Sequence, residues 1–72
     1  MRGDTVTIKC DLIKQYRRTH ALSKAEFYAK CRIHFITGSN MLRGETVSLV
    51  TAKKVAAVLG IKVQELIQSW ND

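Results

Sequence analysis

The sequence contains no proline, and only four of its 72 residues are glycine. Proline and glycine are the strongest local breaks in a chain, so capping residues and these few glycines must mark most of the helix ends. The sequence also lacks repeats and low-complexity tracts. Because 46% of the residues are hydrophobic and 25% are charged, the composition excludes an intrinsically disordered chain.

Long hydrophobic runs are absent as well. The longest stretch without a charged residue, 33–42, is too short and too polar for a membrane-spanning helix. The first residues lack the apolar segment that a secretory signal peptide requires. We therefore predict a cytoplasmic protein with no membrane association.

Cysteine is scarce, with Cys10 and Cys31 as the two examples. Both fall on apolar faces, which predicts buried free thiols. A zinc site built from these cysteines with His20 and His34 is an alternative, but Cys31 and His34 form the one closely spaced pair in that set. No nucleophile stands at a plausible spacing from a paired base, so we expect no catalytic residues, no metal or other cofactor, and no small-molecule substrate.

The length of 72 residues suits one domain, 1–72, which buries about 60% of the surface of its unfolded chain. Its formal charge of +6 favours an anionic partner, either a nucleic acid or an acidic protein surface. A solvated helix face is the alternative explanation for the four basic residues that precede residue 20, namely Lys9, Lys14, Arg17 and Arg18.

Apolar spacing and caps predict five short helices. We expect them at about residues 7–19, 24–31, 35–43, 49–59 and 63–69. Ser23 and Glu26 form a capping box before the second helix, with Leu22 and Phe27 placed as a hydrophobic staple. Gly44 and Gly60 are placed to terminate the third and fourth helices. The helical spacing also puts Trp70 on one face with Val63, Leu66 and Ile67. The sequence thus predicts an all-α fold, a compact five-helix bundle.

From Leu12 onward, the order of these signals resembles the Cro and lambda-repressor family of helix-turn-helix domains. The matching pieces are Leu12-Ile13-Lys14 with Arg17, Leu22-Ser23, Glu26-Phe27 through Lys30-Cys31 with Ile33, Asn40 to Gly44, Val55 to Ile61, and Glu65-Leu66-Ile67. The resemblance implies the lambda-repressor-like fold, with the motif at about residues 23–44 in the second and third helices.

The resemblance also implies roles for the outward side chains of the motif. In such domains one helix braces across the phosphate backbone while the next lies in the major groove. Ser23 and Lys24 would then contact phosphate. The residues facing a DNA or protein partner would be Phe35, Ile36, Thr37, Ser39, Asn40 and Arg43. Asn40 suits adenine, and Arg43 suits guanine or a phosphate.

Three positions depart from the family pattern. Tyr28 replaces a small residue, Arg32 replaces the turn glycine, and Gly38 replaces a buried aliphatic residue. We expect either Tyr28 or Phe35 to fill the volume that Gly38 leaves. The pair Phe35-Ile36 is a poor surface for reading bases, and core packing of Phe35 is the competing interpretation.

Two functions follow from these observations. The first is direct, Cro-like binding to operator DNA, normally as a dimer with steep salt dependence. The second is binding to another regulator, because length, charge and the degenerate motif are similar to those of the small modulators of repression in temperate lactococcal phages. That similarity implies the N-terminal helix-turn-helix domain of a phage repressor as partner, alone or on operator DNA, and a role in the choice between lysis and lysogeny in the bacterial host. The pair Phe35-Ile36 favours the second function, because it stands where a DNA reader is expected to have polar groups.

Overall fold

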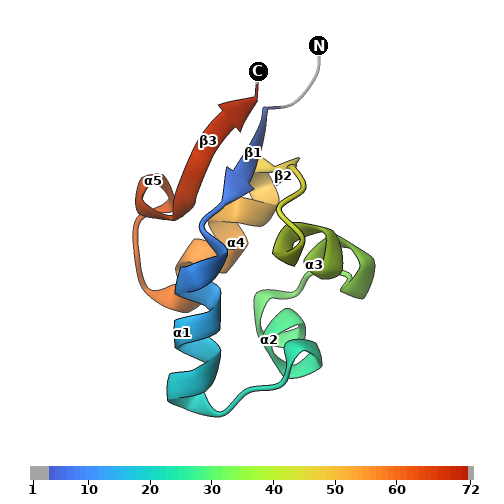
Figure 1. Cartoon of the computed structure of the whole chain (residues 1–72), viewed down its shortest axis with the longest axis vertical. Helices are drawn as coiled ribbons and strands as arrows, with labels where there is room; N and C mark the ends of the chain where they lie inside the picture. The colour runs from blue at the N-terminus through green and yellow to red at the C-terminus, as the bar shows by residue number, and fades with distance from the viewer. Residues whose placement is uncertain (1–3, 72) are drawn as a thin grey trace.

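A computed structural model of the chain describes residues 4–71. Three strands form one small sheet, and the helices lie below and beside it (Figure 1). In chain order the elements are β1 (Thr5–Ile8), α1 (Cys10–His20), α2 (Lys24–Cys31), α3 (Phe35–Leu42), β2 (Val47–Ser48), α4 (Leu49–Leu59), α5 (Val63–Leu66) and β3 (Ile67–Asn71).

The predicted all-α bundle is wrong, because both ends of the described chain are strands. The five helices are present, but they share the fold with a three-stranded antiparallel sheet in the order β2-β1-β3. The first helix starts at Cys10 instead of residue 7, and the last helix ends at Leu66 instead of residue 69. In β1, Val6 and Ile8 are buried while the alternate positions are partly exposed, which is the period of two that a half-buried strand shows. All four residues of β1 are β-branched, a class that favours strands over helices.

The sheet joins segments that lie far apart in the sequence. Val6 pairs with Val47 on β2 and with Trp70 on β3. Thr7 pairs with Ser69, and their hydroxyl oxygens are 2.7 Å apart. The register shifts between Thr7 and Ile8, where the ladder contains an irregularity of the β-bulge type.

The core lies between the sheet and the helices and takes residues from nearly every element. Its largest fully buried side chains are those of Phe27, Ile13, Met41, Leu66, Val6, Val55 and Cys31. Leu12 and Tyr16 pack against this core, as the apolar spacing of the first helix predicted. Trp70 does not join it: the side chain lies on β3 and is 51% exposed. The prediction that Trp70 lies on a helix face is wrong, because the last helix ends at Leu66.

The three central helices confirm the predicted boundaries within one residue. Ser23 and Ser48 cap α2 and α4 with their hydroxyl oxygens, and Ser23 and Glu26 form the full capping box. Gly60 ends α4 in the left-handed conformation, with φ of 75°. Gly44 follows the cap of α3 with φ of 87°. Among residues 4–71, none of the helices has the length and apolar composition needed to cross a bilayer.

Candidate functional site

The segment from residue 23 to residue 44 forms two short helices with a tight connection. Arg32 caps the end of α2 in the left-handed conformation, with φ of 59°, and its N–H donates to the carbonyl of Ala29 at 3.1 Å. A glycine adopts this backbone without strain, whereas a residue with a Cβ atom pays roughly 1–2 kcal/mol. Arg32 therefore adopts, with a side chain, a backbone conformation that favours glycine.

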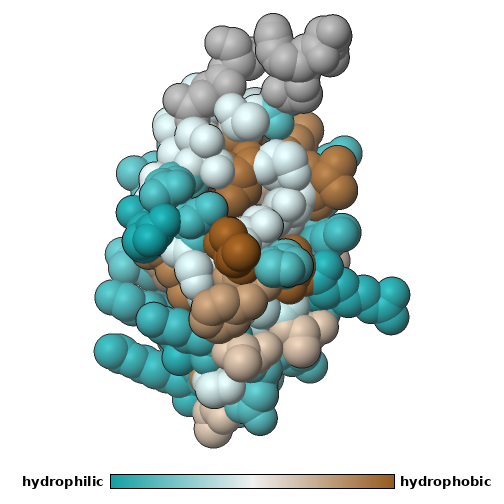
Figure 2. Space-filling model, turned by 90° about the vertical axis from the view of Figure 1, so that its right-hand side faces the viewer, coloured by the Kyte–Doolittle hydropathy of each residue, from teal (hydrophilic) through white to brown (hydrophobic). Residues whose placement is uncertain are grey.

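The first turn of α3 carries an exposed apolar pair. Phe35 is 58% exposed and Ile36 is 63% exposed. His34 caps the helix, because its Nδ1 accepts a hydrogen bond from the Ile36 N–H at 3.2 Å. On the face where α2 and α3 lie, apolar side chains gather in the middle and hydrophilic ones surround them (Figure 2). The core-packing interpretation of Phe35 is thus wrong, and the pair is available to a partner.

The departures at residues 28 and 38 are explained by one contact. A Cβ atom at Gly38 would lie 2.5 Å from Cδ1 and 2.7 Å from Cζ of Tyr28, and it would meet Cε1 of the same ring. Both residues are buried. The ring of Tyr28 therefore fills the space that an aliphatic side chain at position 38 would occupy, as one of the two sequence-based alternatives predicted.

The polar residues at the end of α3 bind one another. Arg43 Nη2 donates to Asn40 Oδ1 at 2.6 Å and to Glu45 Oε2 at 3.0 Å. The side chains of Arg43 and Glu45 are 65% and 54% exposed, so this ion pair contributes little to stability. It does matter for recognition, because Asn40 and Arg43 must break these bonds before they can read base edges.

Thr37 and Ser39, the other predicted contact residues of α3, are partly buried. Thr37 and Asn40 line a hollow of about 300 Å³ between α3 and the start of α4. Sequence reasoning missed the rest of its lining, which is Thr46, Val47, Ser48 and Thr51. Three hydroxyl-bearing residues within six positions were the available signal. Val50 of α4, at 63% exposure, is an exposed apolar side chain outside the two helices of the candidate site.

The predicted phosphate contacts at the start of α2 are exposed, but Ser23 is engaged in capping. Its hydroxyl oxygen accepts from the Glu26 N–H at 3.1 Å, and the Glu26 carboxylate accepts from the Ser23 N–H at 2.8 Å. The hydrogen bond from the Ser23 backbone holds the pKa of Glu26 below its usual range, and the bond to the Ser23 side chain adds to this effect. Lys24 is fully on the surface of the same turn.

The capping box gives a pH-dependent stability prediction. Removing the hydroxyl in Ser23→Ala should lower the free energy of unfolding by about 1 kcal/mol at pH 7. Because the pKa of Glu26 is lowered by folding, its contribution is present above its usual pKa and is lost as the pH falls through the lowered value. Urea unfolding followed by circular dichroism at pH 7 and pH 3 measures both effects. The matched variant Glu26→Gln should lose less stability between these pH values than the wild type, and an identical loss would contradict this account.

Three of the twelve lysine and arginine residues lie on α1, and none lies on α3. Lys14, Arg17 and Arg18 line a hollow of about 260 Å³ together with Leu22. Arg17 is held in place, because its Nε donates to the carbonyl of Leu22 at 3.2 Å. The residues of α3, by contrast, include no charged side chain. Phe35 and Ile36 therefore stand on an uncharged helix, with Arg32 exposed three residues before Phe35.

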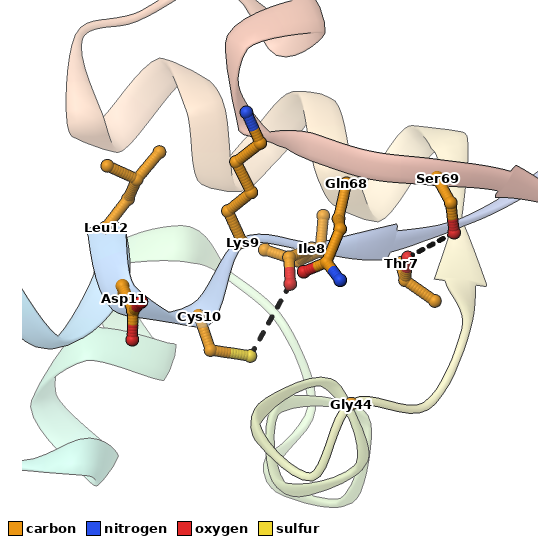
Figure 3. Close-up of a pocket in the computed structure, with 9 residues that line it drawn as sticks. All are labelled: Thr7, Ile8, Lys9, Cys10, Asp11, Leu12, Gly44, Gln68 and Ser69. Atoms are coloured by element: carbon orange, nitrogen blue, oxygen red, sulfur yellow. Dashed lines mark hydrogen bonds between the residues drawn. The ribbon is translucent and has the colours of Figure 1, made fainter.

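A further hollow, of about 720 Å³, lies where β1 passes into α1 (Figure 3). The thiol of Cys10 lines this hollow, and its one hydrogen can be donated either to the Ile8 carbonyl at 3.6 Å or to the closer Met41 carbonyl at 3.3 Å. Burial raises the pKa of Cys10, and burial raises the pKa of Cys31 to about 11. Both thiols thus stay protonated near neutral pH, and Cys10 links the start of α1 to α3. Cys10 is half-buried, not fully buried as expected, while Cys31 is buried. Within residues 4–71, no three His, Cys, Asp or Glu side chains are grouped as metal ligands.

The chain was compared with known proteins in three ways. No protein-family model, curated protein or solved structure matches it. The assignment of this surface depends on its residues and geometry, and these place an uncharged, apolar helix start at the centre of the candidate site.

Proposed function

We propose that this protein is a small transcription regulator of a phage-type genetic switch that binds the DNA-binding domain of a partner repressor. In this role α2 and α3 act as a helix-turn-helix whose outward face docks onto protein. The observation that carries the proposal is the exposure of Phe35 and Ile36 at the start of α3. Large apolar side chains that lie next to one another on a protein surface often mark a site of interaction with a partner.

A partner that itself binds DNA is basic, so the charge of α3 matters for docking. A DNA-binding domain is positively charged on its reading face, and this chain carries a formal charge of +6, so the two repel at long range. Repulsion at the contact is reduced because α3 is uncharged and Arg43 is paired with Glu45. Apolar anchors on an uncharged helix can therefore dock where a basic helix could not.

The same features weigh against direct operator binding as the main activity. Phosphate contacts supply most of the affinity for DNA, and α3 offers no cation of its own. Asn40 and Arg43, which suit base reading, already form a hydrogen bond with each other. Docking onto the repressor instead masks or remodels that partner's DNA-reading face, and it shifts the choice between lytic and lysogenic growth in the host cytoplasm.

The test uses the purified chain, the N-terminal helix-turn-helix domain of a lactococcal phage repressor of the proposed kind, and the operator DNA of that repressor. We expect a complex of the two proteins in size-exclusion chromatography, with a Kd below about 10 μM by calorimetry. We expect the chain alone to bind operator and scrambled DNA equally weakly at moderate salt. Absence of a complex contradicts the proposal. Sequence-specific DNA binding by the chain alone, with a steep salt dependence, would assign direct operator binding instead.

A further inference from the structure

The ring of Tyr28 lies beside the exposed pair as well as against Gly38. Tyr28 comes from α2 and is 3% exposed, and its ring meets the ring of Phe35 edge to face, with centroids 5.4 Å apart and an interplanar angle of 77°. This is the favourable geometry for two aromatic rings. One buried ring therefore contacts both the backbone of α3 and the exposed side chain at its start.

Tyr28 packs against one face of α3. Phe35, Gly38 and Leu42 recur at helical spacing, so they share a face of the helix. Tyr28 occupies the position over Gly38 on that stripe, where its ring fills the space that a side chain at residue 38 would need. Phe35 meets the Tyr28 ring in an edge-to-face contact and stays largely exposed.

We propose that Tyr28 is a positioning residue for partner binding: through the space beside Gly38 it holds Phe35 outside the core in one orientation. This inference rests on the proposed function, because it concerns the same docking surface. Its physical basis is preorganisation. A side chain already fixed in its bound orientation loses less conformational entropy on docking than one free to rotate.

The hydroxyl of Tyr28 is not needed for this role. Among the described residues it is the one buried side-chain oxygen or nitrogen atom without a hydrogen-bond partner. A buried polar group without a partner is destabilising. The structure thus separates the ring, which makes the contacts, from the hydroxyl, which makes none, and it supplies a conservative control.

The main test is a double-mutant cycle on affinity for the repressor domain. We expect Tyr28→Leu to weaken binding about 10-fold, because Leu preserves an apolar side chain but not the flat edge that supports Phe35. In a Phe35→Ala background, Tyr28→Leu should change affinity by less than about twofold. Tyr28→Phe should bind within twofold of wild type and be at least as stable. An equal loss from Tyr28→Leu in both backgrounds would show that Tyr28 acts independently of Phe35, and a 10-fold loss in Tyr28→Phe would show that the hydroxyl is required; either result overturns the inference.

A second variant separates stability from positioning. Gly38→Ala alone should destabilise the chain, because its new methyl group overlaps the Tyr28 ring. In Tyr28→Leu with Gly38→Ala the smaller side chain makes room for that methyl group. Stability should recover while affinity stays about 10-fold low, and recovery of both would contradict a positioning role.

The last measurement follows Phe35 in the free protein, so it does not depend on any partner. Labelling with 4-fluorophenylalanine gives two fluorine signals, one from buried Phe27 and one from exposed Phe35. We expect Tyr28→Leu to change the solvent isotope shift or line width of the Phe35 signal, and Tyr28→Phe to leave both unchanged. If Tyr28→Leu changes neither the isotope shift nor the line width of the Phe35 signal, the inference is overturned even where the repressor complex forms. Failure of wild type to bind the repressor overturns the proposed function, whatever this signal shows.

Discussion

Ile36→Glu should weaken binding to the repressor domain by more than about 100-fold and leave the fold intact. Ile36 is 63% exposed, so in the free protein a glutamate there stays in water. In a complex the same carboxylate is pressed into an apolar contact, where an unpaired charge is strongly unfavourable. Calorimetry with the wild-type and variant chains measures the loss of affinity, and circular dichroism with thermal unfolding checks the fold.

Val50→Glu is the matched control for that experiment. Val50 is also aliphatic, helical and 63% exposed, and the substitution changes net charge by the same amount. We expect its affinity to stay within about threefold of wild type. A comparable loss in both variants would point to net charge or to a broader surface, and would contradict the assignment of binding to the start of α3.

The central part of the fold was predictable because its signals are local. The boundaries of α2 and α4 follow from Ser23 and Ser48, whose hydroxyls bond to backbone N–H groups three residues away. The sheet was not predictable in the same way. Thr7 and Ser69 pair across 62 positions of sequence, and no local pattern announces such a partner.

The last segment shows how two periodicities can coincide. Leu66 and Ile67 are both buried, as on a helix face, but the helix ends between them and Ile67 belongs to β3. Short apolar runs of this kind fit either period. Pairing with β1 decides the outcome, since the Lys9 N–H donates to the Leu66 carbonyl at 2.9 Å and the strand continues from there.

The sequence predicted which residues of α3 face outward, but not the hydrogen bonds and ring contacts that their side chains make. The spacing of Ile36, Asn40 and Arg43 placed them on one side of α3, and none of the three is buried. The bond between Asn40 and Arg43, and the pairing of Arg43 with Glu45, depend on rotamers that spacing does not specify. The exposure of Phe35 depends on where a ring from α2 lies, which is a tertiary contact.

The two phenylalanines should give opposite phenotypes when each is replaced by alanine. Phe27 is fully buried and its ring meets those of Tyr16 and Tyr28 edge to face, at 5.9 Å and 6.5 Å between centroids. Phe27→Ala should cost about 3–5 kcal/mol. Domains of this size have roughly 4–11 kcal/mol in total, so this variant should lose a large share of its stability and unfold at a clearly lower temperature.

Phe35→Ala should instead change the free energy of unfolding by less than about 1 kcal/mol, because the side chain is mostly in water and loses mainly its contact with Tyr28. Its affinity for the repressor domain should fall at least about 30-fold, which corresponds to about 2 kcal/mol. Urea unfolding and calorimetry on both variants separate the two effects. A strong loss of stability in Phe35→Ala, or unchanged affinity in a folded Phe35→Ala, would contradict the role of this residue. Since the two rings flank the same tyrosine from inside and outside the core, opposite results would locate the boundary between folding and recognition at Tyr28 itself.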